Sequence, residues 1–336
     1  MDPFTLRLAA GNQVAGLLSL PLKPTDAPKG FPLVIMIHGG TYTASYFDAD
    51  ATHSISIPAK ALSIPVIALT RPGYGDSTPL PPLEDGETWI QQSGTYIHEF
   101  VLPAIWREYG KRSGASSMVL YGHSIGGAIA VVATACHNRS PDTAGYPLSG
   151  LVTSGIGALS SVPVTKYDAS EAERTSTMGQ MDTYEPQPGV AAPSLTWPRE
   201  EKDALMLRPQ DHLCDPKLLE GTTAGLNHPM SLAEVTDVRR QWPEYWLGYA
   251  TDVTVPHMYA LGSEDILWPP VKQSVDAFVA GFTSCVQMEV LTIRLAPHCI
   301  ELSYLGQSWM VRMLGFAGEC AVLDALQKER KAGGQL

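Results

Sequence analysis

Short, unbroken apolar runs alternate with stretches of helical patterning along this chain, and this alternation restricts the possible folds more than any other feature. The runs at residues 33–37, 66–69 and 118–121 are too short for buried helices. Continuous apolar runs of this length are typical of strands buried on both faces. Helical patterning occupies residues 50–62 and 89–109 between them. The chain is therefore predicted to form a mostly parallel sheet whose right-handed crossovers place helices on both faces.

Further elements are expected on either side of this central alternation. Residues 6–20 indicate an antiparallel hairpin around Gly11 and Asn12, two residues that favour tight turns. More strands are expected at 151–153, 257–261 and 288–295, followed by a closing helix over about 305–328. Residues 1–5 are expected to be a short lead-in or an expression-vector remnant outside the fold.

The alternation of strands and helices stops between residues 159 and 230. This stretch has many Pro, Gly, Thr and acidic residues and no clear buried strand. A structureless segment of this length inside a compact domain is uncommon unless it is functional or carries its own helices. We therefore predict one core formed by residues 1–158 and 231–336, with a lid at 159–230 inserted into it.

Charge and cysteine usage narrow the class of protein. The net charge of −11 and the absence of a basic cluster exclude nucleic acid as an expected partner. The five cysteines are odd in number and lack metal-type spacing, so neither a disulfide framework nor a metal site is expected. No leader peptide is recognisable, and no apolar run approaches the roughly 20 residues that span a bilayer. We expect a cytoplasmic protein of undetermined oligomeric state.

The clearest indication of chemistry is Gly122-His123-Ser124-Ile125-Gly126, which joins a predicted strand to a predicted helix. This is the Gly-x-Ser-x-Gly pattern of a nucleophile elbow. The sharp turn strains the serine backbone and leaves no room for side chains at the two glycines. Ser124 is thus the predicted nucleophile, and the Ile125 N–H at the helix start is predicted to face a developing oxyanion.

A second N–H for that oxyanion is expected from the loop that starts at His38, Gly39 and Gly40 and follows the first central strand. Gly40 is the candidate donor, with Thr41 next. A plain glycine turn after a strand is the alternative interpretation.

A serine nucleophile needs a base, and that base needs a third group to orient it. Among nine histidines, His298 is favoured because it stands just past the last predicted strand. Asp265 is the favoured acid because it lies in a polar break after a buried run, with the adjacent Glu264 as the alternative. Candidate pocket residues flank these motifs: Thr41, Tyr42, His123 and Trp268.

With these residues identified, the sequence resembles the α/β-hydrolase superfamily over nearly its whole length. The resemblance rests on the glycine loop at 38–40, Arg71-Pro72-Gly73-Tyr74-Gly75-Asp76-Ser77, the Ser124 elbow, residues 262–265 and His298, and on the chain order serine, aspartate, histidine. It implies an α/β-hydrolase fold with a sheet of about eight strands. It also implies a serine esterase, lactonase or thioesterase that needs no cofactor. The acidic residue common before Arg-Pro-Gly is Thr70 here, and we assign no catalytic role to the 71–77 loop.

The expected substrate is a carboxylic ester, lactone or thioester of a hydrophobic small molecule, cleaved through an acyl-enzyme. Four large side chains of the lid could either roof its pocket or pack the lid on the core: Tyr167, Tyr184, Trp197 and Met206. Residues 297–301 are similar to small-molecule hydrolases found beside fungal biosynthetic enzymes, which suggests a polyketide-like or terpenoid ester. Two alternatives stay open: a C–C bond hydrolase or lyase with the same triad, and a ligand receptor that has kept the hydrolase pocket.

Overall fold

A mixed, mostly parallel sheet of eight strands forms the centre of the molecule, in the order β1-β2-β4-β3-β5-β6-β9-β10. The computed structural model describes residues 1–22, 29–158 and 184–334. Strand β1 (Asp2–Arg7) pairs antiparallel with β2 (Gln13–Ser19), which pairs antiparallel with β4 (Val66–Thr70). The remaining strands run parallel: β3 (Pro32–Ile37), β5 (Ser117–His123), β6 (Leu148–Ser154), β9 (His257–Gly262) and β10 (Met288–Ile293). The predicted sheet of about eight strands is confirmed.

The first strand begins earlier than the sequence indicated. Residues 2–5 pair with residues 15–18, so the expectation that residues 1–5 lie outside the fold was wrong. Phe4 explains this, because its ring packs edge-on against Tyr109 with 5.8 Å between the ring centroids. The N-terminal ammonium of Met1 also lies 2.5 Å from Asp48 Oδ2. The contact of Phe4 with Tyr109, in a helix far along the chain, therefore stabilises residues 2–5 as part of the sheet.

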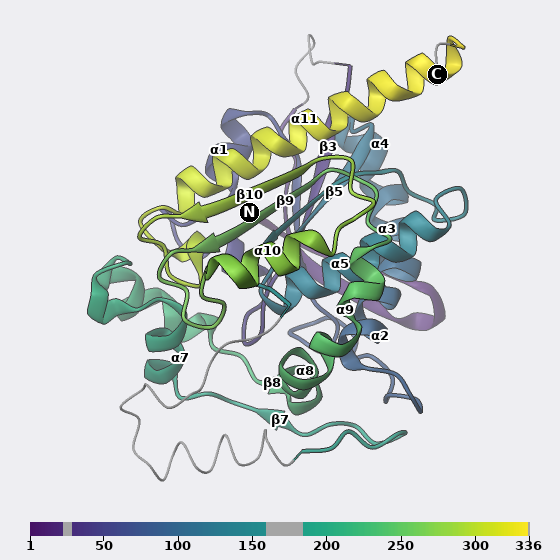
Figure 1. Ribbon diagram of the computed structural model, residues 1–336. Coiled ribbons are helices and arrows are strands. Elements are labelled where there is room, and N and C mark those ends of the chain that lie inside the picture. The colour runs from purple at the N-terminus through teal and green to yellow at the C-terminus, as the bar shows by residue number, and fades with distance from the viewer. Residues whose placement is uncertain (23–28, 159–183, 335–336) are drawn as a thin grey trace.

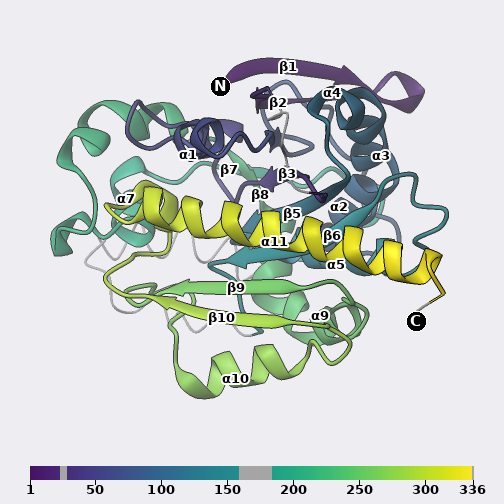
Figure 2. The same ribbon diagram turned by 90° about the horizontal axis from the view of Figure 1, so that it is seen from above.

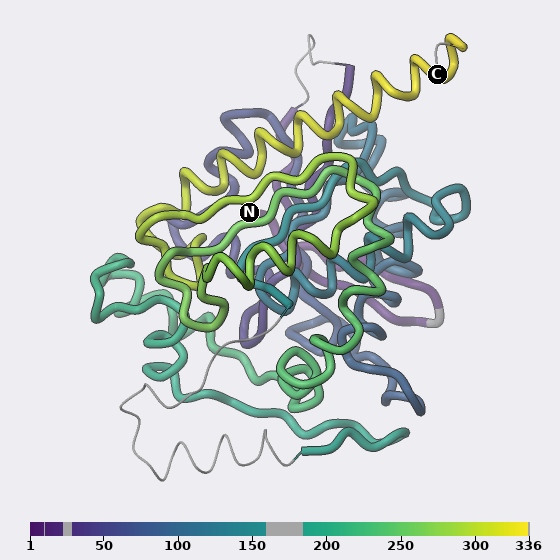
Figure 3. The backbone as a smooth tube through the Cα atoms, viewed as in Figure 1, coloured from purple at the N-terminus to yellow at the C-terminus, as the bar shows by residue number. Residues whose placement is uncertain are grey.

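Helices cover both faces of the sheet (Figures 1 and 2). Alternate residues of β3 supply the two cores: Leu33, Ile35 and Ile37 face one apolar cluster, whereas Val34 and Met36 face the other. One face packs against α2 (Trp89–Tyr96), α3 (Leu102–Ile105), α5 (Ile125–Arg139), α9 (Trp242–Ala250) and α10 (Lys272–Ala280). The other packs against α1 (Ser56–Ala61) and the long closing helix α11 (Gly306–Ala332), which Figure 3 shows running along the sheet. Both faces of the central strands are thus buried.

Two expected helices differ in detail from the structure. The run that starts with α2 continues through π-helical turns at η3 (Ile97–Val101) and η4 (Trp106–Gly110) and ends with α4 (Lys111–Ser113). The helix expected over 50–62 begins only at Ser56, because Asp50 accepts the backbone N–H groups of Thr52 and His53 and closes a turn. Asp side chains favour such turns over helix interiors.

Residues 184–241, which precede α9, lie mostly below the sheet in the view of Figure 1. Residues 159–183, Tyr167 among them, lie outside the described residues. Residues 184–241 contain β7 (Ser194–Leu195), α7 (Arg199–Met206), η6 (Pro209–Asp211), η7 (Leu218–Thr222), η8 (Thr223–Leu226), β8 (Met230–Ser231), α8 (Leu232–Thr236) and η9 (Asp237–Gln241). Pairing of β7 with β8 places Met230 opposite Leu195. In the parts of the chain that the structure describes, no helix combines the length and apolar character needed to cross a membrane.

Candidate active site

Ser124 occupies a strained turn between β5 and α5. Its backbone has φ 54° and ψ −127°, a conformation that residues other than glycine rarely adopt. A Cβ on Gly122 would lie 2.2 Å from the Gly126 carbonyl oxygen, and a Cβ on Gly126 would lie 2.3 Å from that of Ile37. Neither glycine can carry a side chain without displacing backbone. The two glycines therefore allow strand, turn and helix to approach closely enough to hold Ser124 in this conformation.

His298 and Asp265 form a buried pair at the carboxyl ends of the neighbouring strands. His298 follows β10, Asp265 follows β9, and His298 Nδ1 lies 2.8 Å from Asp265 Oδ2. The second carboxylate oxygen, Oδ1, accepts the N–H groups of Leu267 and Trp268, each at 2.9 Å. These bonds fix the carboxylate and direct the His298 Nδ1–H toward it. The other ring nitrogen, Nε2, is buried and has no hydrogen-bond partner among the described residues.

Glu264, the alternative acid, makes a different contact. Its carboxylate accepts a hydrogen bond from Ser263 Oγ at 2.9 Å. It is only partly buried, whereas Asp265 is 2 % exposed. Asp265 is thus the carboxylate that contacts His298 in the structure.

The glycine loop after β3 lies directly against the nucleophile turn. A Cβ on Gly39 would lie 3.0 Å from Ser124 Cβ, and one on Gly40 would lie 3.3 Å from Ile125 Cδ1. Thr41 has φ 66°, so the chain turns sharply after Gly40. The structure therefore brings together the two residues, Gly40 and Ile125, whose N–H groups the sequence indicated as oxyanion donors.

His123 links the nucleophile turn to His298. Its ring centroid lies 4.8 Å from that of His298, and on its other side it stacks on Tyr46 at 5.0 Å. Its Nδ1 lies 2.9 Å from Ser154 Oγ. Burial lowers the pKa of His123 well below its ordinary value, and His298 and His38 add to that effect. His123 is thus a neutral packing partner of His298.

The other candidate pocket residues lie around this group. Tyr42 packs against Tyr46 with 4.7 Å between the ring centroids, and Lys202 Nζ from α7 lies 4.5 Å from the Tyr42 ring centre. Trp268 packs against Gly157, where a Cβ would lie 3.1 Å from its ring. All four candidates, Thr41, Tyr42, His123 and Trp268, are buried. Their contact with a substrate stays a prediction.

Glu301 is a fully buried acid that sequence reasoning did not find. It stands three residues after His298 and accepts hydrogen bonds from Tyr46 Oη at 2.5 Å and Trp309 Nε1 at 3.0 Å. Ser154 Oγ lies 3.4 Å from the same carboxylate, so Glu301 belongs to the polar group that surrounds His123. Burial raises its pKa to about 7. Glutamate is rarely fully buried, so its apolar neighbours in the sequence gave no sufficient reason to single it out.

Replacing Glu301 by glutamine should change how stability depends on pH. The folded state binds the Glu301 proton more tightly than the unfolded state, because burial raises its pKa from 4.5 to about 7. The wild-type free energy of unfolding should therefore fall by up to roughly 3 kcal/mol relative to Glu301→Gln as the pH rises through that interval. Urea denaturation between these pH values measures the difference. The exposed control Glu84→Gln should follow the wild-type curve, and a Glu301→Gln curve parallel to wild type would contradict the assignment.

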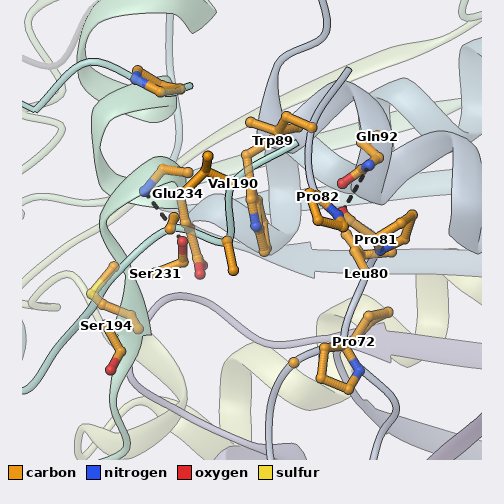
Figure 4. A pocket seen from close by; sticks show the side chains of 18 of the residues that line it. Pro72, Leu80, Pro81, Pro82, Trp89, Gln92, Val190, Ser194, Ser231 and Glu234 are labelled. Atoms are coloured by element: carbon orange, nitrogen blue, oxygen red, sulfur yellow. Dashed lines mark hydrogen bonds between the residues drawn. The ribbon is translucent and has the colours of Figure 1, made fainter. Parts of the chain in front are cut away.

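A cleft of about 390 Å³ lies between the loop after β4 and the segment that leads into α8 (Figure 4). Its walls include several proline and aromatic side chains: Pro72, Pro79, Pro81, Pro82, Tyr74, Trp89 and Tyr184. Met230 lines the cleft and also reaches the glycine loop, where a Cβ on Gly40 would lie 2.7 Å from its methyl carbon. Of the aromatic residues expected in the lid, Tyr184 both lines the cleft and packs against the core, and Trp197 packs against the core.

The fold and the site together define a class of protein. A mostly parallel sheet carries a strained serine after β5, an aspartate after β9 and a histidine after β10, the arrangement of an α/β-hydrolase. The chain belongs to the alpha/beta hydrolase family, whose characteristic sequence pattern matches residues 34–294. No curated protein sequence matches the chain.

Solved structures resemble this fold along nearly the whole chain. A proline iminopeptidase from Mycobacterium smegmatis is 16% identical, with 96% of this chain and 100% of that chain covered and a TM-score of 0.59. A thermophilic esterase from Thermogutta terrifontis is 14% identical, with 96% and 100% covered and a TM-score of 0.56. A monoacylglycerol lipase from Paleococcus ferrophilus is 16% identical, with 87% and 96% covered and a TM-score of 0.56. At these identities the likeness concerns the fold and leaves the substrate open.

Proposed function

We propose that the protein is a serine hydrolase that cleaves a carboxylic ester, lactone or thioester of a hydrophobic small molecule through an acyl-enzyme. The observation that carries this proposal is the buried His298–Asp265 pair at 2.8 Å, which packs beside the turn that holds the strained Ser124 and whose Nε2 has no hydrogen-bond partner among the described residues. His123 contacts the His298 ring and directly precedes Ser124 in the elbow. A serine, a histidine and a buried carboxylate in this order supply nucleophile, base and orienting acid.

The proposed reaction proceeds in two halves. His298 Nε2 takes the proton of Ser124 Oγ as this oxygen attacks the acyl carbonyl, and Asp265 stabilises the imidazolium that forms. The N–H groups of Gly40 and Ile125 bind the oxyanion. His298 then returns the proton to the leaving alcohol or thiol. A water molecule, activated by the same histidine, cleaves the acyl-enzyme, and all steps use side chains, backbone and water.

The cleft that meets the site where Met230 contacts Gly40 supports a hydrophobic substrate, and its lining includes neither Ser124 nor His298. The proline- and aromatic-lined cleft beside Met230 is a suitable place for an apolar group, since small-molecule sites are mostly apolar with few polar groups. Within this proposal, residues 159–230 act as the lid, and Tyr184 forms part of its inner surface. A panel of acyl esters that vary in chain length and ring size tests the substrate class. A product that gains the mass of one water distinguishes hydrolysis from a lyase reaction.

Separate substitutions of the two adjacent acids test the orienting role. Asp265→Asn should lower kcat roughly 10³- to 10⁴-fold, because an amide at this position no longer stabilises the correct tautomer and the imidazolium of His298. Steady-state hydrolysis of a p-nitrophenyl ester measures the loss. Glu264→Gln is the matched control and should stay within about twofold of wild type, because the Glu264 carboxylate contacts Ser263 and not His298. A larger loss at Glu264 than at Asp265 would reverse the assignment.

A further inference from the structure

Arg71 is a buried cation whose guanidinium reaches the glycine loop. It directly follows β4 and is 1 % exposed. Its Nη2 donates to the Gly39 carbonyl oxygen at 2.9 Å and also to Glu234. The guanidinium carbon lies 4.7 Å from the Tyr74 ring centre. Removing a charge from water is costly unless it is paired and hydrogen-bonded. Within the part of the chain that the structure describes, the carboxylate paired with Arg71 is that of Glu234, which is itself fully buried in α8.

The Gly39 carbonyl oxygen also accepts a hydrogen bond from His38. His38 Nδ1 lies 2.7 Å from this oxygen, and His38 Nε2 accepts the backbone N–H of Arg71 at 3.0 Å. Arg71 Nε also approaches Nδ1, but at 3.5 Å, so the much shorter contact with the Gly39 oxygen places the proton on Nδ1 and makes the ring neutral. Burial, followed by the charge of Arg71, lowers the pKa of His38 well below its ordinary value, in agreement with that tautomer. One donor from the glycine loop, His38, and one from the loop after β4, Arg71, thus hold the same carbonyl oxygen.

This oxygen belongs to the same peptide group as the Gly40 N–H. In a trans peptide the C=O and N–H bonds point in opposite directions, so fixing the oxygen also fixes the direction of the N–H. Donors on the oxygen polarise the peptide and strengthen its N–H as a donor. An oxyanion donor acts through such preorganisation, and small misplacements are costly in rate.

We propose that Arg71 is a positioning residue that sets the Gly40 N–H of the oxyanion hole through the Gly39 carbonyl, and that Glu234 couples this setting to the segment bordering the cleft. The inference rests on the proposed function, in which the Gly40 N–H binds the oxyanion. The same segment supplies Met230, which packs against Gly40. Residues 230–234 therefore hold the glycine loop in two ways, by an apolar contact at Gly40 and by a buried ion pair at Arg71.

The double variant Arg71→Met with Glu234→Gln tests the proposal. Removing both buried charges together avoids leaving one of them unpaired, which would destabilise the fold. We expect kcat to fall about 10- to 100-fold with KM within about twofold, because the lost interaction acts on the transition state. The inhibition constant of a trifluoromethyl ketone, which mimics the tetrahedral intermediate, should rise by the same factor. Thermal unfolding verifies that the variant is folded.

Arg71→Lys is the second arm, and it keeps the charge beside Glu234. A lysine ammonium lacks the planar fork with which arginine serves several acceptors at once. We expect a smaller fall in kcat, about 3- to 10-fold, again with KM unchanged. This variant decides the question if the double variant does not fold.

The matched control is Arg139→Met with Asp252→Asn. Arg139 likewise donates to a carboxylate and a backbone carbonyl, those of Asp252 and Gly248, and lies 4.8 Å from the Tyr249 ring centre. It is on the surface, remote from the site, and the control should keep wild-type kinetics. Wild-type kcat in the folded Arg71 variants, or a rise in KM with kcat unchanged, would overturn the proposal. Failure of the proposed function looks different, because the wild type itself would then show no Ser124-dependent hydrolysis.

Discussion

Ser124→Ala is expected to abolish hydrolysis, with kcat reduced roughly 10³- to 10⁶-fold. The triad acts as a unit, so removal of the nucleophile leaves only the catalysis that the oxyanion hole and substrate binding provide. A fluorophosphonate probe should label the wild type and leave the variant unlabelled. Mass spectrometry of the labelled peptide should place the adduct on Ser124.

The control for this experiment is Ser140→Ala, which removes an exposed hydroxyl at the end of α5. It should retain labelling and turnover. Labelling of Ser124→Ala at the wild-type rate would remove Ser124 from the mechanism. The proposed function would then need another nucleophile.

His298→Asn is expected to be nearly as damaging, with a loss of several orders of magnitude, about 10³- to 10⁶-fold in kcat. An amide cannot take the Ser124 proton near neutral pH, and a serine hydroxyl without a base is a weak nucleophile. Single-turnover acylation measured by stopped flow should slow by the same factor, because the histidine acts in that half-reaction. Substrate affinity should change little.

His212→Asn is the matched substitution for this comparison. His212 is exposed, in η6's terminal turn with φ 57°, a conformation that asparagine tolerates. Its kinetics should equal those of the wild type. Unimpaired turnover by His298→Asn would require a different base, and the buried His123 beside it would be the next to replace.

The contacts of the loop after β4 became visible only in the folded protein. The motif at 71–77 stood out in the sequence, but nothing in its local pattern indicated what it does. In the structure Arg71 reaches Gly39 on one side and Glu234 on the other, 163 residues away along the chain. Because Glu234 also lines the cleft, a ligand bound there would lie next to the ion pair that holds the glycine loop.

The sheet could be predicted because most of its strands have a recognisable local sequence pattern. An apolar run of four to seven residues is too short for a typical helix and fits a buried strand, and the runs at β3, β4 and β5 have this form. The first half of β1 could not be predicted in this way. Its pattern is short and weak, and its place in the sheet depends on Phe4 meeting Tyr109.

The placing of Ser124, Asp265 and His298 at one edge of the sheet could be predicted from the sequence, because each stands just past a recognisable strand and the carboxyl ends of parallel strands meet at one edge. Local backbone sterics also explain the glycines around Ser124. The choice between Asp265 and Glu264 was of another kind. Asp265 and Glu264 are adjacent and have nearly the same sequence surroundings, so the sequence pattern does not separate them. Only the folded loop shows which carboxylate contacts His298.

Buried charges depended on tertiary structure throughout. Glu301, Arg71 and Glu234 are residue types that are ordinarily exposed, and their sequence surroundings do not distinguish them from surface residues. Each is buried because partners from distant segments supply hydrogen bonds or opposite charge: Tyr46 and Trp309 for Glu301, and Arg71 and Glu234 for each other. The sequence by itself determined which apolar residues are buried together, because periodicity and local motifs encode this. Which charged residues are buried was decided by the tertiary structure, because a buried charge needs a partner that only the folded chain brings into contact with it.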